Sequence, residues 1–79
     1  SFKKCLKRGF DPALFEEVVF ILGQQGSLPL KYKPHKLSGK YKGLWECHIT
    51  PDWLLVWEQN DCELILILID TGSHADLFK

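Results

Sequence analysis

The chain has 79 residues, of which 46% are hydrophobic and 25% charged; this size and balance exclude intrinsic disorder and predict one packed domain over residues 1–79. The longest apolar run is six residues, at 64–69, whereas a bilayer-spanning helix needs roughly 20, so we expect no membrane partner. The formal net charge is zero, yet residues 1–42 carry nine Lys/Arg against three acids and residues 43–79 one Lys against seven acids. The basic half therefore faces either a polyanion or only solvent.

Two helical segments are predicted near the N-terminus. Residues 3–8 are short and basic and fit the end of a helix that Gly9 stops. Asp11 is followed by Pro12, the pairing of an N-cap with proline at the first helical position. Apolar residues then recur with helical spacing at Leu14, Val18, Ile21 and Leu22. The pattern predicts a helix over about residues 12–23.

The remainder of the chain changes from a polar loop to strands. Glycine and proline end the helix, and the segment up to Gly43 is predicted to be a long basic loop. Apolar runs at 44–49, 53–57 and 64–69, separated by turn residues, predict an antiparallel meander. We expect the third run to be a central strand buried on both faces, and residues 76–78 to add a short terminal strand. The fold class is α+β, with N-terminal helices packed on a small antiparallel β-sheet.

The cysteines and the start of the chain bear on the cellular compartment. Cys5, Cys47 and Cys62 form an odd set without CxxC spacing, which argues against a disulfide framework and a zinc finger. We expect reduced, packed thiols. The basic N-terminal residues are not followed by an apolar signal-peptide core, so a cytoplasmic location is expected. The missing initiator Met suggests a chain that begins inside a longer polypeptide, although a processed start would look the same.

All three histidines, His35, His48 and His74, lie beside predicted turns or at strand ends. A tight turn would bring His48 and Asp52 to one end of the sheet. Imidazole titrates near neutral pH and serves as general acid or base. A pair of such groups suits RNA cleavage by the ribose 2′-OH, with cations stabilising the phosphate and no metal or other cofactor. Two alternatives remain: ordinary surface histidines, and a zinc site, which the absence of HxxxH spacing disfavours.

Aromatic residues are numerous for a small domain. Most are expected in the core, but Trp53 and Phe78 lie beside the acid–base candidates and are the better candidates for stacking on an RNA base.

Three blocks of the sequence resemble the signature of YafQ-type mRNA interferases in the RelE/ParE toxin superfamily. They are LPLKYKPHKLSG at 28–39, GLWECHITPDWLL at 43–55 and TGSHADLF at 71–78. The blocks follow the family's order and, with the preceding helix, span nearly the whole chain.

The resemblance implies a RelE-like fold and an endoribonuclease that enters the ribosomal A site, cuts mRNA codons and is held inactive by a co-encoded antitoxin. Carried over, the catalytic positions fall on His35, His48, Asp52 and His74, and Trp53 and Phe78 line the site. We expect His74 to be the general acid and His35 the general base, with His48 and Asp52 orienting the groups. Partners would be the cognate antitoxin, the ribosome and mRNA, without direct DNA binding by the toxin alone.

Two departures from the family pattern stand out. Many relatives carry Arg where this chain has Trp45, so a phosphate contact is either missing or supplied by Lys36, Lys40 or Lys42. Relatives also begin with a strand ahead of the first helix, and we expect its absence to leave a sheet edge exposed. Two other functions remain open: a non-catalytic gyrase poison like the ParE branch, and a remnant that binds antitoxin without activity.

Overall fold

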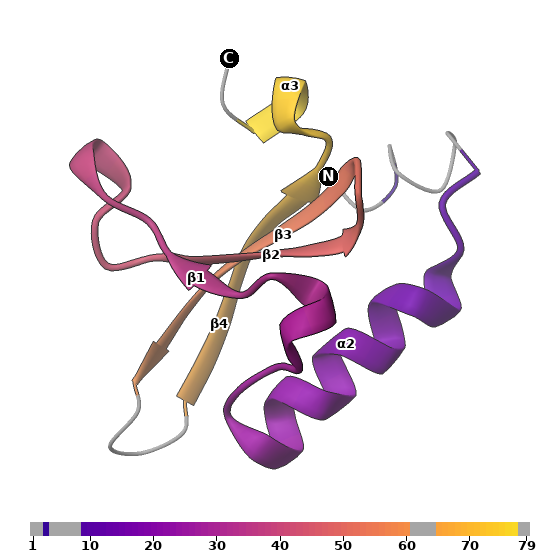
Figure 1. Cartoon of the computed structure of the whole chain (residues 1–79), viewed down its shortest axis with the longest axis horizontal. Helices are drawn as coiled ribbons and strands as arrows, with labels where there is room; N and C mark the ends of the chain where they lie inside the picture. Colours follow the sequence, from indigo (N-terminus) through magenta and orange to yellow (C-terminus); the bar gives the residue numbers. More distant parts are fainter. Residues whose placement is uncertain (1–2, 4–8, 61–64, 78–79) are drawn as a thin grey trace.

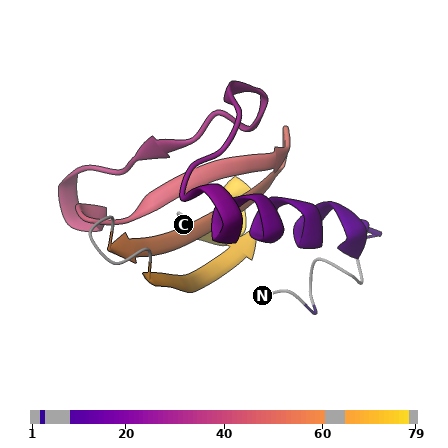
Figure 2. The ribbon, with the colours of Figure 1, turned by 90° about the horizontal axis from the view of Figure 1, so that it is seen from below.

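The computed structural model describes residue 3 and residues 9–60 and 65–77. Four strands form one antiparallel sheet in the order β1-β2-β3-β4, and the long helix α2 lies against it (Figures 1 and 2). The elements in chain order are α2 (Pro12–Gln25), η1 (Leu30–Tyr32), β1 (His35–Lys36), η2 (Gly39–Tyr41), β2 (Trp45–Thr50), β3 (Trp53–Asn60), β4 (Ile65–Gly72) and α3 (His74–Leu77). This arrangement confirms the predicted α+β fold class, with a helix packed on a small antiparallel β-sheet. Within the described residues, no helix combines the length and apolar character needed to cross a membrane.

Helix α2 begins where the sequence places it and ends two residues later than predicted. The Asp11 carboxylate accepts a hydrogen bond from the Ala13 amide at 2.9 Å, and Pro12 takes the first helical position. The helix continues through Gly23 because the left-handed residue that ends it is Gly26, whose φ is 69°. The Gly26 amide donates to the Leu22 carbonyl at 2.8 Å, which is the usual way a glycine closes a helix. The predicted helix end at residues 4–8 lies outside the described residues.

The core lies between α2 and one face of the sheet. Its buried side chains are Val18, Leu22, Leu28, Tyr32, Cys47, Ile49, Trp53, Leu55 and Trp57. The core residues of β2 and β3 occupy every second position, because alternate side chains of a strand point to the same face of the sheet. Burial raises the pKa of the Cys47 thiol to about 12, so this cysteine is a packed, protonated thiol, as predicted. Cys5 and Cys62 lie outside the described residues.

The segment predicted to be a long basic loop contains short regular elements. Two 3-10 turns, η1 and η2, flank the two-residue strand β1, which pairs with β2 through His35 opposite Glu46 and Lys36 opposite Trp45. The Leu37 amide donates to the Leu44 carbonyl at 2.8 Å immediately beyond the strand. The prediction of an irregular loop is therefore wrong where β1 adds a fourth strand to the sheet.

Strand β4 corrects two further predictions. Its apolar run was expected to be central, but β4 pairs only with β3 among the described strands and lies at the edge of the sheet. Ile67, Leu68 and Ile69 are 51%, 44% and 48% exposed, because the fourth strand, β1, is added beside β2 and leaves β4 at the edge. Leu66 is the described apolar side chain of β4 that packs against the core. After β4 the chain forms the short helix α3 (Figure 1). The terminal strand expected at residues 76–78 is therefore wrong for residues 76–77, and Phe78 lies outside the described residues.

Candidate active site

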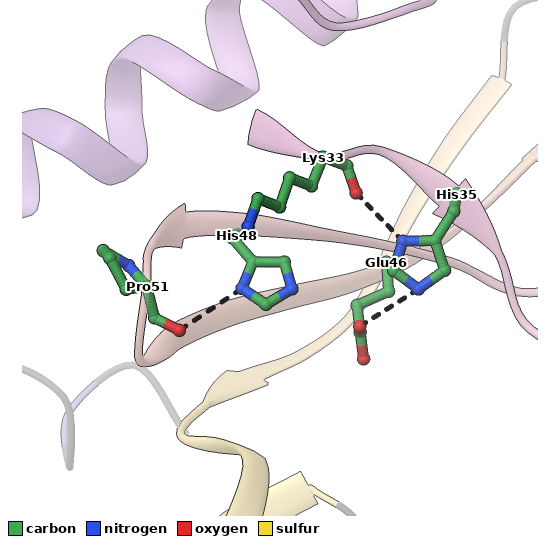
Figure 3. Close-up of polar contacts among 5 residues, drawn as sticks. All are labelled: Lys33, His35, Glu46, His48 and Pro51. Carbon is green, nitrogen blue, oxygen red and sulfur yellow. Dashed lines mark hydrogen bonds and ion pairs between the residues drawn. The ribbon is translucent and has the colours of Figure 1, made fainter. Parts of the chain in front are cut away.

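The face of the sheet opposite α2 carries two of the three histidines. Trp45 and Cys47 of β2 face the core. Side chains alternate along a strand, so Glu46 and His48 point to the opposite face of the sheet. His35 lies directly across from Glu46 in the β1–β2 pairing, which puts it on the same face. Figure 3 shows the three side chains on this side of the sheet. We call His35, Glu46 and His48 the histidine face.

Both ring nitrogens of His35 have oxygen acceptors. Nδ1 lies 2.9 Å from the Lys33 carbonyl, and Nε2 lies 3.3 Å from Oε1 of Glu46. The side chain of Glu46 is 8% exposed and that of His35 is 48% exposed. The more exposed imidazole thus provides the partner that a buried carboxylate requires. A carbonyl and a carboxylate only accept hydrogen bonds, and a ring protonated at both nitrogens satisfies both. The geometry therefore suits a positively charged imidazolium at His35.

His48 is held differently. Its Nδ1 lies 3.3 Å from the Pro51 carbonyl oxygen in the turn between β2 and β3. Because this oxygen only accepts, the hydrogen of a neutral ring belongs on Nδ1, and Nε2 retains its lone pair. No described residue forms a hydrogen bond with Nε2 of His48. This partly exposed imidazole can therefore accept a proton from a bound molecule.

The other two catalytic candidates lie near the same end of the sheet. Asp52 is exposed in the β2–β3 turn, where the Thr50 hydroxyl donates to its carboxylate at 3.3 Å. His74 is exposed and opens α3, two residues after Gly72. Gly72 pairs with Leu54, which in turn pairs with His48. Two strand spacings, roughly 10 Å, thus separate the backbone of His48 from the end of β4 that leads into His74.

Trp53 does not lie where the sequence suggested. Its side chain is 0% exposed, its ring stacks on Phe10 with centroids 4.9 Å apart, and its indole N–H donates to the Thr71 hydroxyl at 2.7 Å. A ring enclosed in this way offers no face to an RNA base, so its assignment to RNA stacking is corrected to a core role. The second stacking candidate, Phe78, lies outside the described residues.

The three lysines proposed to bind RNA are exposed but do not join the histidine face. Lys36 alternates with His35, and its ammonium lies 5.4 Å from the centroid of the Trp45 ring on the opposite side of the strand. The ammonium of Lys40 lies 5.2 Å from the Tyr41 ring centroid. Lys36 and Lys42 line a cavity of about 380 Å³ with Trp45. Positive charge from Lys36 and Lys42 thus gathers around Trp45.

Two carboxylates on this side of the sheet were missed by sequence reasoning. Glu46 precedes His48 by two residues, and this spacing places both side chains on one face of a strand. The spacing therefore could have identified Glu46 from the sequence. Asp70 lies opposite Val56, which is itself opposite Glu46, and its carboxylate accepts from the Thr71 amide at 2.8 Å. Among the described residues, no group of three or more His, Cys, Asp or Glu side chains is arranged to hold a metal ion.

Known proteins show the same fold. The family model described as the bacterial toxin of type II toxin-antitoxin system, YafQ, matches residues 1–79. The mRNA interferase toxin YafQ of Escherichia coli K12 is 43% identical over 51 residues, which are 65% of this chain and 53% of that protein. The matched segment thus spans about half of that relative.

Solved structures agree over almost the entire chain. YafQ in the E. coli DinJ–YafQ complex is 33% identical with a TM-score of 0.86, and the match covers 99% of this chain and 86% of that one. A copper-bound mutant toxin from Helicobacter pylori is 42% identical with a TM-score of 0.85, covering 98% of this chain and 85% of that one. With the family model matched from the first residue to the last, the chain belongs to the YafQ family of bacterial toxins of type II toxin–antitoxin systems.

Proposed function

We propose that this chain is a cytoplasmic endoribonuclease toxin that cleaves mRNA on the ribosome and is neutralised by a cognate antitoxin. One observation carries the proposal: His35 and His48 share a sheet face but have complementary hydrogen bonding, one suited to positive charge and the other to accepting a proton. The name of the E. coli relative, mRNA interferase toxin, supports the substrate class. The solved complex of E. coli YafQ with DinJ supports an antitoxin partner.

In the proposed reaction, Nε2 of His48 removes the proton from a ribose 2′-OH. The 2′-oxygen then bonds to the adjacent phosphorus, and the bond from phosphorus to the 5′-oxygen breaks. His74, initially protonated, gives its proton to that departing oxygen. The products are a 2′,3′-cyclic phosphate and a 5′-hydroxyl, His48 ends protonated and His74 neutral. This assignment transfers the base role from His35 to His48. Both ring nitrogens of His35 lie beside oxygen acceptors, whereas at His48 one contact of this kind is found among the described residues, at Nδ1.

In this mechanism His35 is a fixed cation for the phosphate. Charge builds up on the non-bridging oxygens as the 2′-oxygen attacks, and a preorganised imidazolium stabilises that charge. Glu46 and the Lys33 carbonyl hold the ring in place before the substrate arrives. Asp52 remains a proposed catalytic residue at the mouth of the β2–β3 turn, where it can orient an imidazolium or a ribose hydroxyl.

Addition of the purified protein to a translating extract tests the proposal. We expect cuts inside the coding sequence of a defined mRNA, fragments with 2′,3′-cyclic phosphate and 5′-hydroxyl ends, and no cuts when translation initiation is blocked. His48→Gln should abolish the cuts, whereas Gln24→Ala on the exposed surface of α2 provides a matched control with wild-type activity.

Other outcomes identify the alternatives. Intact mRNA together with gyrase-linked DNA breaks would indicate a gyrase poison. Intact mRNA with normal antitoxin binding would indicate an inactive remnant. Equal cleavage by wild type and His48→Gln would remove His48 from the mechanism.

A further inference from the structure

A cavity of about 430 Å³ opens beside His48, and the proposed cleavage reaction assigns it no role. It lies between η1, the first turns of α2 and the end of β2; its lining includes Leu14, Tyr32, Lys33, His48, Ile49 and Pro51. We propose that this cavity binds the mRNA nucleotide that carries the attacking 2′-OH, and that it thereby fixes the direction in which the RNA strand crosses the site. The inference rests on the proposed ribonuclease function.

The cavity exists because β1 is so short. Pairing of β1 with β2 begins at His35 opposite Glu46; on the other side of Glu46, at His48 and Ile49, β2 has no described strand along this edge. The chain that precedes His35 instead turns away through η1, which leaves the space between η1, α2 and the strand edge. Its lining combines apolar groups, such as the 39% exposed Leu14, with cationic and imidazole side chains, a composition typical of small-ligand sites.

Lys33 connects this cavity to the histidine face. It is the non-glycine residue with positive φ among those described, at 50°, a conformation that costs an L-residue about 1–2 kcal/mol. Its amide closes η1 by donating to the Leu30 carbonyl at 2.9 Å, and its carbonyl accepts from the His35 ring. Its side chain extends toward His48 (Figure 3). An ammonium and an imidazole on one wall suit the phosphate of a nucleotide.

The charges of the lining favour a nucleic acid over an acidic or neutral small molecule. Lys31 and Lys33 outnumber the single acid, Glu17. The Lys31 ammonium lies 5.0 Å from the Tyr32 ring centroid, so one face of that ring is already covered. We therefore expect the base to contact the apolar wall of Leu14, Ile49 and Pro51, and the phosphate on its 5′ side to contact Lys33.

The direction of the RNA follows from the chemistry. The attacking 2′-OH belongs to the nucleotide on the 5′ side of the cut, and the leaving 5′-oxygen belongs to the nucleotide on its 3′ side. If His48 is the base, the 5′ nucleotide occupies the cavity that His48 lines. If His74 is the acid, the 3′ nucleotide lies toward α3, across two strand spacings. The strand then runs 5′ to 3′ from the η1 side of β2 toward α3.

Nuclear magnetic resonance with an uncleavable probe tests this without requiring activity. The probe is an RNA trinucleotide with 2′-deoxyribose at the cut site and a spin label on either its 5′ or its 3′ end. We expect the 5′ label to broaden the amides of Tyr32 and Ile49, and the 3′ label to broaden that of Ala75. The opposite pattern, or no change at Tyr32 and Ile49 at millimolar probe, overturns the proposal.

A charge variant tests the phosphate contact. Lys33→Met keeps the length of the side chain and removes its charge, and should weaken probe binding about tenfold and reduce the salt slope of the affinity by about 0.7. Lys3→Met, at an exposed residue that does not line the cavity, is the control of equal net charge. Equal binding by the two variants refutes the contact.

The cavity and the ribonuclease function can fail separately. If the protein cleaves translated mRNA but its cavity does not bind the probe, only the proposal that the cavity binds a nucleotide is refuted. Ordered probe binding by a protein that leaves mRNA intact would refute only the function. If Lys33→Met weakened antitoxin binding and left probe binding unchanged, the occupant would be an antitoxin segment and the nucleotide assignment would be wrong.

Discussion

Replacement of Glu46 by Gln tests whether the charge of His35 matters. The amide keeps the size of the side chain and an oxygen that accepts from Nε2, but removes the carboxylate 3.3 Å away. At that distance two unit charges attract by about 1.3 kcal/mol in water and about 5 kcal/mol at an effective dielectric constant of 20. The His35 side chain is 48% exposed, so we take a value near the lower end, about 1.5–2 kcal/mol.

If the imidazolium stabilises the transition state, that loss corresponds to a roughly tenfold to thirtyfold lower kcat/KM for Glu46→Gln. The measurement is single-turnover cleavage on programmed ribosomes, which separates chemistry from product release. Glu46→Asp restores the charge at a longer distance and should recover part of the rate. Thermal unfolding of each variant shows whether the fold is kept.

A double-mutant cycle tests whether Glu46 affects cleavage through His35. In a His35→Gln background, Glu46→Gln should cost little further activity, because the group through which Glu46 acts is absent. If the two losses are independent and add fully, or if Glu46→Gln cleaves at the wild-type rate with an unchanged Tm, Glu46 does not position His35 and the reasoning is wrong.

Four further predictions follow from the site and its surroundings. His74→Ala should lower cleavage at least about a hundredfold in a folded protein; a wild-type rate would remove it from the mechanism. Reversing the charge of Lys36, Lys40 and Lys42 should weaken ribosome binding and flatten its salt dependence, and binding unchanged at every salt concentration would mean a solvated surface. Untagged protein should cleave in chelator at fixed free magnesium; stoichiometric zinc or copper, with activity lost on removal and regained on return, would contradict this. Because the raised pKa of Cys47 keeps its thiol neutral in the fold, stability should fall as the pH rises from about 9, where the unfolded thiol ionises, toward 12, with a smaller fall in Cys47→Ala.

Local signals in the sequence predicted most helices and strands well, but they did not predict which elements lie side by side in the fold. Asp11 and Pro12 fix the start of α2 because capping is decided within a few residues. The run at 64–69 shows only that β4 is apolar; whether it is central depends on the side to which β1 is added, about 30 residues earlier in the chain. Trp53 adjoins Asp52 in sequence, yet the reversal of direction at the turn places one side chain in the core and the other in solvent.

The histidine face depends on the register of a two-residue strand. A slip of one residue in the β1–β2 pairing would set His35 opposite Cys47, and its side chain would point into the core. One hydrogen bond on each side of β1 opposes such a slip. Before the strand, the Lys33 amide donates to the Leu30 carbonyl and closes η1. After the strand, the Leu37 amide donates to the Leu44 carbonyl. The left-handed backbone of Lys33 lies within the first of these, and its carbonyl also holds the His35 ring. The strained residue thus fixes the strand register, the orientation of the imidazole and one wall of the cavity, which is why strain at this position is compatible with function.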